Sequence, residues 1–152
     1  MLRDFSPLEL LADRLRASPA ADREIFSDFT AACTRLQALR TSGKAGRFDE
    51  LVANGAWTES AFALVTLEMP AWSVRRLVYD DGEWICSLSQ QPNLPLEIDD
   101  TVDARHAALP LAILGALVEA KSRKEPAPQP DFQRRPQLGS EITYAQCCDN
   151  FA

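Results

Sequence analysis

The chain has 152 residues, of which 46% are hydrophobic and 25% are charged, and its formal net charge is −6. These proportions are typical of a globular protein and exclude a collagen-like, fibrous or wholly unfolded chain. The excess of acidic groups lies in residues 49–110, where eleven acidic side chains outnumber three basic ones. Such a surface repels phosphate backbones, so we expect no nucleic-acid partner.

A helical pair is predicted at the N-terminal end. A Ser-Pro pair at residues 6–7 is a typical helix start, and leucines then recur at helical spacing over residues 7–17. A second Ser-Pro pair at residues 18–19 repeats the pattern. The apolar face that follows it predicts one continuous helix that ends near residues 41–43.

The next two segments predict different structures. Residues 48–55 suit a short helical turn closed by Asn54 and Gly55. Residues 61–69 are apolar and fit either a helix or a strand, but their partial alternation and β-branched side chains favour a strand. We predict that they form the first strand of an antiparallel sheet.

A β-hairpin over residues 72–90 is the strongest local pattern in the sequence. Two runs rich in Val, Ile, Tyr and Trp flank an Asp-Gly pair at residues 81–82, which favours a two-residue turn. Together with residues 61–69, the hairpin predicts a three-stranded antiparallel meander packed on helices, which is an α+β fold. The cross-strand pairs that the turn predicts are Tyr79 with Trp84, Leu77 with Cys86, and Arg75 with Leu88.

Both faces of the predicted hairpin carry apolar residues. The face opposite Cys86 holds four of them, namely Trp72, Val74, Val78 and Ile85. A sheet face with this much apolar surface needs cover. We therefore expect helices on one face, and a loop, the C-terminal tail or a second subunit on the other.

An acidic loop over residues 96–102 and an apolar helix over about residues 107–122 follow the hairpin. The next residues hold three prolines in five positions, as in an extended linker. We predict one α+β domain over residues 1–124. We also predict a Pro-rich extended tail over residues 125–152, docked on its own or a neighbouring subunit.

Cysteine usage and hydropathy indicate the compartment. The first residues interleave acids and bases, so no secretory signal is expected, and the longest apolar run is shorter than the roughly 20 residues of a membrane span. We expect a cytoplasmic protein with reduced thiols. Cys147 and Cys148 are candidate metal ligands by residue type, but adjacent cysteines lack the spacing of zinc sites. No metal or cofactor is therefore expected.

The first function that these patterns suggest is a non-enzymatic protein-interaction or regulatory module. It would act through its sheet and tail, as a homodimer. The second is a cysteine-dependent enzyme in which Cys86 is the nucleophile and His106 its base. A small buried thiol and a polar residue near a helix start would explain the same two positions without any catalysis.

The third function is small-molecule binding. Trp72 and Trp84 would line a pocket, and Arg75 or Arg76 would bind an anionic group of the ligand. Aromatic side chains in a small domain more often belong to the core, and arginines beside acidic residues on a hairpin more often form cross-strand ion pairs. Of the three functions, the sequence favours the interaction module.

Overall fold

A computed structural model describes residues 6–124, so the predicted tail lies outside the described residues. The described part has an α+β fold with one three-stranded antiparallel sheet of order β1-β2-β3. The helices are α1 (Pro7–Ala17), α2 (Arg23–Ala32), α3 (Thr34–Thr41), α4 (Gly46–Ala53), α5 (Trp57–Glu68) and α6 (Leu109–Lys124), and the strands are β1 (Ser73–Asp80), β2 (Glu83–Ser89) and β3 (Val102–His106).

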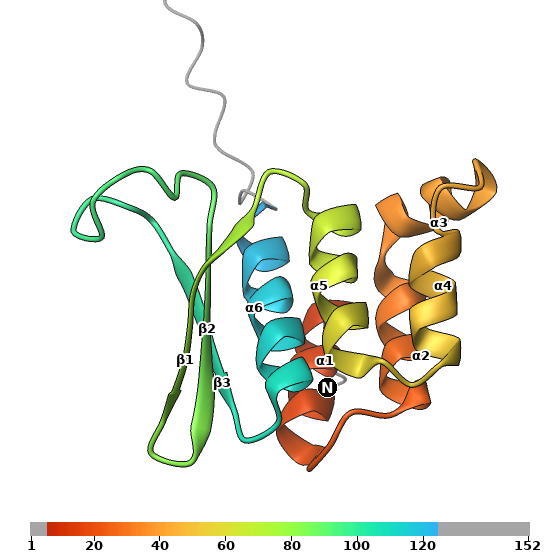
Figure 1. Cartoon of the computed structure of the whole chain (residues 1–152), viewed down its shortest axis with the longest axis horizontal. Coiled ribbons are helices and arrows are strands. Elements are labelled where there is room, and N and C mark those ends of the chain that lie inside the picture. Colours follow the sequence, from red (N-terminus) through yellow and green to blue (C-terminus); the bar gives the residue numbers. More distant parts are fainter. Residues whose placement is uncertain (1–5, 125–152) are drawn as a thin grey trace, which may run out of the picture.

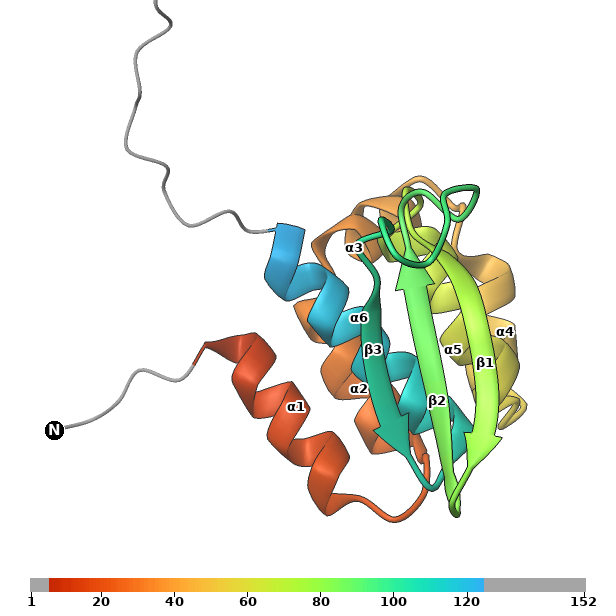
Figure 2. The ribbon, with the colours of Figure 1, turned by 90° about the vertical axis from the view of Figure 1, so that its left-hand side faces the viewer.

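The helices stack in layers on one face of the sheet (Figure 1). Helix α6 packs against β2 and β3, helices α1 and α5 pack against α6, and helices α2 to α4 lie beyond them. The opposite face of the sheet, onto which Figure 2 looks, carries no helix of the described chain. None of the described helices is both long and apolar enough to cross a bilayer.

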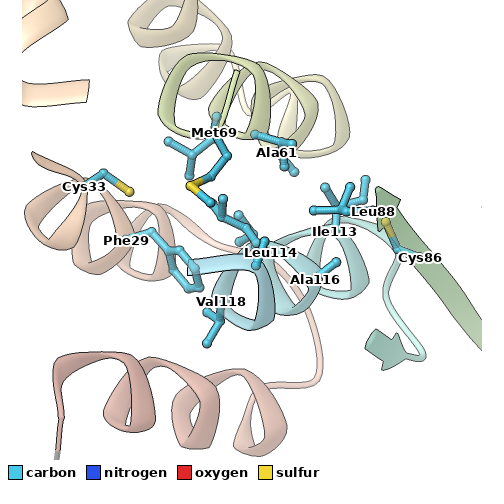
Figure 3. Packing of buried hydrophobic residues seen from close by; sticks show 14 of the residues in the cluster. Phe29, Cys33, Ala61, Met69, Cys86, Leu88, Ile113, Leu114, Ala116 and Val118 are labelled. Carbon is cyan, nitrogen blue, oxygen red and sulfur yellow. The ribbon is translucent and has the colours of Figure 1, made fainter. Parts of the chain in front are cut away.

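Helix α6 is at the centre because it is apolar on all sides, which is the pattern of a buried helix. Most of its residues between Leu111 and Ala120 are almost fully buried. Figure 3 shows side chains from three directions around it, from α2, from α5 and from the sheet. Gly115 allows a close approach to β3, because a Cβ at this position would lie 3.0 Å from that of Ala104.

The predicted hairpin is confirmed. Asp81 and Gly82 have φ values of 50° and 80°, as a type I′ turn requires, and this turn matches the twist of the two strands. Tyr79 pairs with Trp84, as predicted. The predicted pair of Leu77 with Cys86 also forms.

The predicted pairing of Arg75 with Leu88 is wrong, because β1 contains a β-bulge at Arg75. Leu88 pairs with Val74, and the register shifts by one residue before Arg76. The extra residue turns Val74 toward the helices, where it contacts the core, and Trp72 is buried in the same core. Only two of the four apolar residues predicted on the outer face, Val78 and Ile85, therefore lie there.

The prediction of a strand over residues 61–69 is wrong, because residues 61–68 belong to helix α5 and residue 69 caps its end. The buried positions of α5 have helical spacing and are Ser60, Ala61, Leu64, Val65 and Glu68. The third strand is instead β3, which pairs with β2 and lies between the predicted acidic loop and the predicted apolar helix. In β3 inward and outward residues alternate, but Asp103 and Ala104 are poor strand formers and hide the pattern.

The single helix predicted after α1 is also wrong, because it is two helices separated at Cys33. Ser18 ends α1, and the side chain of Asp22 caps α2 by accepting the N–H of Ile25 at 2.9 Å. Helix α1 begins at Pro7, as the Ser-Pro pair predicts, and the structure adds a capping box between Ser6 and Glu9.

Candidate functional site

Arg75, the predicted anion-binding residue, binds groups of the protein itself. Its guanidinium forms an ion pair with Asp99, whose side chain is only 2% exposed, and donates to the carbonyl oxygen of Leu94 at 2.6 Å. The hydroxyl of Ser89 donates to the same carboxylate at 2.7 and 2.8 Å. This network fixes the loop between β2 and β3 to the end of the sheet, which is a structural role for Arg75.

The other three predicted ligand-binding residues lie apart from one another. Arg76 is exposed on the outer face of the sheet, and Trp84 stacks at a tilt on Tyr79 near the hairpin turn. Trp72 is buried, and its indole N–H has no acceptor among the described residues. Residues 6–124 therefore bring these side chains together in no common pocket.

Cys86 and His106 lie on the same face of the sheet, but both ring nitrogens of His106 bind backbone groups. Nδ1 accepts the N–H of Ala108 at 2.8 Å, so Nε2 carries the proton of the neutral ring and donates to the carbonyl oxygens of Ser18 and Leu15 at 2.9 and 3.1 Å. The imidazole thus joins the end of α1 to the start of α6. Neither nitrogen is free to take a proton from the Cys86 thiol.

The thiol of Cys86 is itself in an environment that opposes catalysis. Burial, assisted by the charge of Asp103, raises its pKa from 9.0 to about 11. Burial, together with the charge of Glu68, raises the pKa of Cys33 to about 12. A nucleophilic cysteine needs a lowered pKa, so both thiols fit a structural role.

These raised pKa values predict a loss of stability at alkaline pH. Above pH 9 the unfolded chain releases the two thiol protons while the folded protein keeps them, so unfolding becomes more favourable as the pH rises toward 11 and 12. In a Cys147→Ser/Cys148→Ser variant, we expect denaturant titrations to show this loss of stability, and Cys33→Ala to reduce it. A thiol reagent should label no cysteine of the folded variant at pH 8. Rapid labelling of the folded form would contradict the assignment.

The candidate metal ligands are not tested by the structure. Cys147 and Cys148 lie outside the described residues. Within residues 6–124, no group of three or more His, Cys, Asp or Glu side chains is placed to hold a metal ion.

A groove of about 800 Å³ lies beside α1 and is the site that the structure favours. One wall is α1 from Ser6 to Arg14, the other is formed by the end of α2 and by Thr34, and Lys121 of α6 also borders it. Leu8, Leu10 and Leu11 make the first wall apolar. The second wall contains the short side chains of Ala31 and Ala32, which leave the groove open. Leu10 is 56% exposed although it is a large aliphatic side chain.

The charged groups of the groove are already paired within the protein. Nε of Arg14 lies 2.9 Å from a carboxylate oxygen of Asp28. Nζ of Lys121 lies 2.6 Å from Oε1 of Glu68. A ligand of this groove would therefore find apolar walls and neutralised charges, which suits an uncharged apolar group.

Glu68 also explains why the chain divides into two helices at Cys33. Cysteine gives α3 no side-chain cap, so its first N–H groups need another acceptor. The other carboxylate oxygen of Glu68 accepts the N–H of Leu36 at 2.9 Å. Glu68 thus caps α3 from α5 and binds Lys121 of α6, which holds three helices together beneath the groove.

A second hollow, of about 240 Å³, lies between α1, β3 and α6. Charged side chains surround it, including Arg16, Asp103, Arg105 and Glu119. It is smaller than the usual size of a ligand pocket. No tryptophan or tyrosine of the described chain lines either hollow.

Two large aliphatic side chains, Leu96 and Ile98, are exposed on the loop between β2 and β3. They project from the loop that Asp99 and Arg75 fix to the end of the sheet. Isolated exposed apolar residues are common on soluble proteins. Leu96 is 58% exposed and therefore offers a matched comparison for Leu10.

Comparisons with protein-family models, with curated proteins and with solved structures gave no match. We therefore infer the function from the geometry of this chain. The groove was not predicted from the sequence, because it depends on how α1, α2 and α6 meet. One feature of the sequence could have indicated the groove. Leu8, Leu11 and Leu15 already form the apolar stripe by which α1 packs on the core, so Leu10 is an additional leucine outside this stripe.

Proposed function

We propose that the protein is a non-enzymatic protein-interaction module whose groove along α1 binds an apolar segment of a polypeptide. The exposure of Leu10 on the wall of a groove whose ionic groups are paired is the observation that carries this proposal. Apolar grooves between helices commonly receive an amphipathic segment through a few large side chains. We keep the function that the sequence suggested, but we place its binding surface on the helices and not on the sheet.

The chemistry of the groove defines the segment that it would bind. A charged side chain would lose water there without gaining an unpaired partner, which is unfavourable. Leucine, isoleucine or phenylalanine at helical spacing would instead replace water along the apolar wall of α1. We infer that the ligand presents two or three such residues and no charge toward the groove.

Selection from a library of displayed peptides against the purified full chain tests this proposal. We expect the selected peptides to share large apolar residues and to shift the NMR signals of Leu8, Leu10 and Ala31. Leu10→Glu should weaken binding at least about tenfold, because it places a carboxylate where the peptide buries an apolar group. Leu96→Glu, a change of the same kind at an equally exposed leucine, should have no effect.

Three outcomes would contradict the proposal. The first is peptides that shift the NMR signals of the outer sheet face, near Val78 and Arg76, instead of those of the groove. The second is equal weakening by Leu10→Glu and Leu96→Glu. The third is failure to select any peptide, when circular dichroism shows that the protein used is folded.

The other functions suggested by the sequence gain no support from this geometry. The hydrogen bonds of His106 oppose the cysteine enzyme, and the scattered aromatic residues oppose an aromatic-lined pocket. We propose a cytoplasmic location, because the described cysteines, Cys33 and Cys86, are free thiols that suit a reducing compartment. The homodimer stays a prediction, and the groove function does not require it.

A further inference from the structure

We propose that, in the full chain, the groove is occupied by a segment of residues 131–152 of the same molecule. This inference rests on the function proposed above, since it names a regulator of the same groove. An external partner would then have to displace the chain's own C-terminal segment. Three observations support it: where the described chain ends, how far the following residues reach, and their composition.

The described chain ends beside the groove. Lys121 borders the groove, and the last described residue, Lys124, follows it by less than one helical turn. Figure 2 shows the start of α1 and the end of α6 on the same side of the molecule, the left side in that view. Residues 125–152 therefore begin within a short distance of the apolar wall.

The reach of the following residues covers the whole groove. Seven residues, 125–131, span at most about 24 Å when extended, and the three prolines among them favour extended backbone. Along α1, Ser6 and Arg14 are separated by about 12 Å of helix. Residue 132 can thus reach any part of the groove without disturbing α6.

The composition of residues 131–152 suits the groove. They contain five large apolar side chains and three acidic against two basic groups, so the segment is almost neutral. A nearly neutral apolar segment matches a groove whose charges are paired internally. The apolar residues are Phe132, Leu138, Ile142, Tyr144 and Phe151.

Attachment makes weak docking effective. A short linker holds the segment at a local concentration on the order of 1 mM, so even a Kd of about 0.1 mM would keep the groove mostly filled. A partner binding the same groove would then bind roughly tenfold more weakly than it would bind an empty groove. Occupation by the segment therefore raises the concentration of partner that is needed to fill the groove.

Paramagnetic relaxation in the full chain tests this inference. A nitroxide on Cys147 of a Cys148→Ser variant would report on the segment, because Cys33 and Cys86 are buried and should not be labelled. We expect the backbone signals of Leu8, Leu10 and Ala31 to broaden. Those of Val78 and Arg76, on the outer face of strand β1, should stay sharp.

Two controls identify the segment as the cause. Leu10→Glu should abolish the broadening, whereas Leu96→Glu should preserve it. Phe132→Ser/Leu138→Ser should abolish it as well, and should strengthen binding of a selected peptide roughly tenfold. Circular dichroism of each variant verifies folding, which we expect to be unchanged because Leu10 and Leu96 are exposed.

The outcomes separate this inference from the function on which it rests. Uniform or absent broadening, with peptides that still bind the groove, overturns the inference alone. Broadening in a mixture of isotope-labelled protein and separate spin-labelled protein shows that a second copy supplies the segment, which also overturns it. Broadening of the groove with no selected peptide that binds there would overturn the proposed function, because the groove would then serve only the chain itself.

Discussion

Glu68→Gln is expected to lower the free energy of unfolding by about 3 kcal/mol, the range found when one partner of a buried ion pair is removed. The side chain of Glu68 is 2% exposed, and its two oxygens bind the Lys121 ammonium and the Leu36 N–H. Glutamine has a single acceptor oxygen, so either the Leu36 N–H or the Lys121 ammonium would face its amide NH₂ group, and the negative charge that pairs with Lys121 is lost. Lys121 then remains partly buried and unpaired.

A double-mutant cycle measured by denaturant unfolding checks this result. Lys121→Met removes the ammonium while keeping a side chain of similar length, so the double variant should lose less stability than the two single variants predict together. Glu119→Gln, an exposed neutralisation on the same helix as Lys121, should change stability by less than about 0.5 kcal/mol. Additive losses at positions 68 and 121 would show that the pair does not act as a unit.

Arg75→Met is expected to destabilise the protein by a similar amount, about 3 kcal/mol, because it leaves the Asp99 carboxylate buried without its cation. Loss of the guanidinium also removes the hydrogen bond to the carbonyl oxygen of Leu94. The loop between β2 and β3 therefore loses two contacts with β1. Faster hydrogen exchange should accompany the change in that loop, including Leu94 and Ile98.

Arg76→Met is the matched control, since Arg76 is the next residue of β1 but is exposed on the outer face. It should change stability by no more than about 0.5 kcal/mol. If Arg75 instead served as an anion site, phosphate or sulfate would raise the melting temperature of the wild type but not of Arg75→Met. Such an anion effect, with little loss of stability in Arg75→Met, would overturn the structural role.

Local patterns predicted those parts of the fold that local interactions determine. The start of α1 follows from the capping box at Ser6, and the hairpin follows from the backbone freedom of Gly82 in the turn. In both cases neighbouring residues supply the partners that stabilise the element. Helix α6 was visible for another reason, because a long run of apolar residues is typical of a buried helix.

The wrong predictions are those that tertiary contacts decide. Residues 61–69 are apolar enough for either structure, and packing against α6 selects the helix. The break at Cys33 depends on a carboxylate 35 positions away, at Glu68, which no local pattern contains. The bulge lies at Arg75, whose partner Asp99 is 24 positions away, and it reversed the predicted direction of Trp72 and Val74. The groove depends on three helices, so only Leu10 hinted at it.

The central position of α6 has a consequence for biosynthesis, because this helix is the last described element to be translated. Until it emerges, the sheet and α5 have no shared partner, and residues such as Leu88 and Leu64 remain without their main contacts. The nascent chain therefore cannot close its core progressively from the N-terminus. Completion of folding therefore waits until α6 has been translated, and until then the polypeptide exposes the apolar segments that α6 later covers.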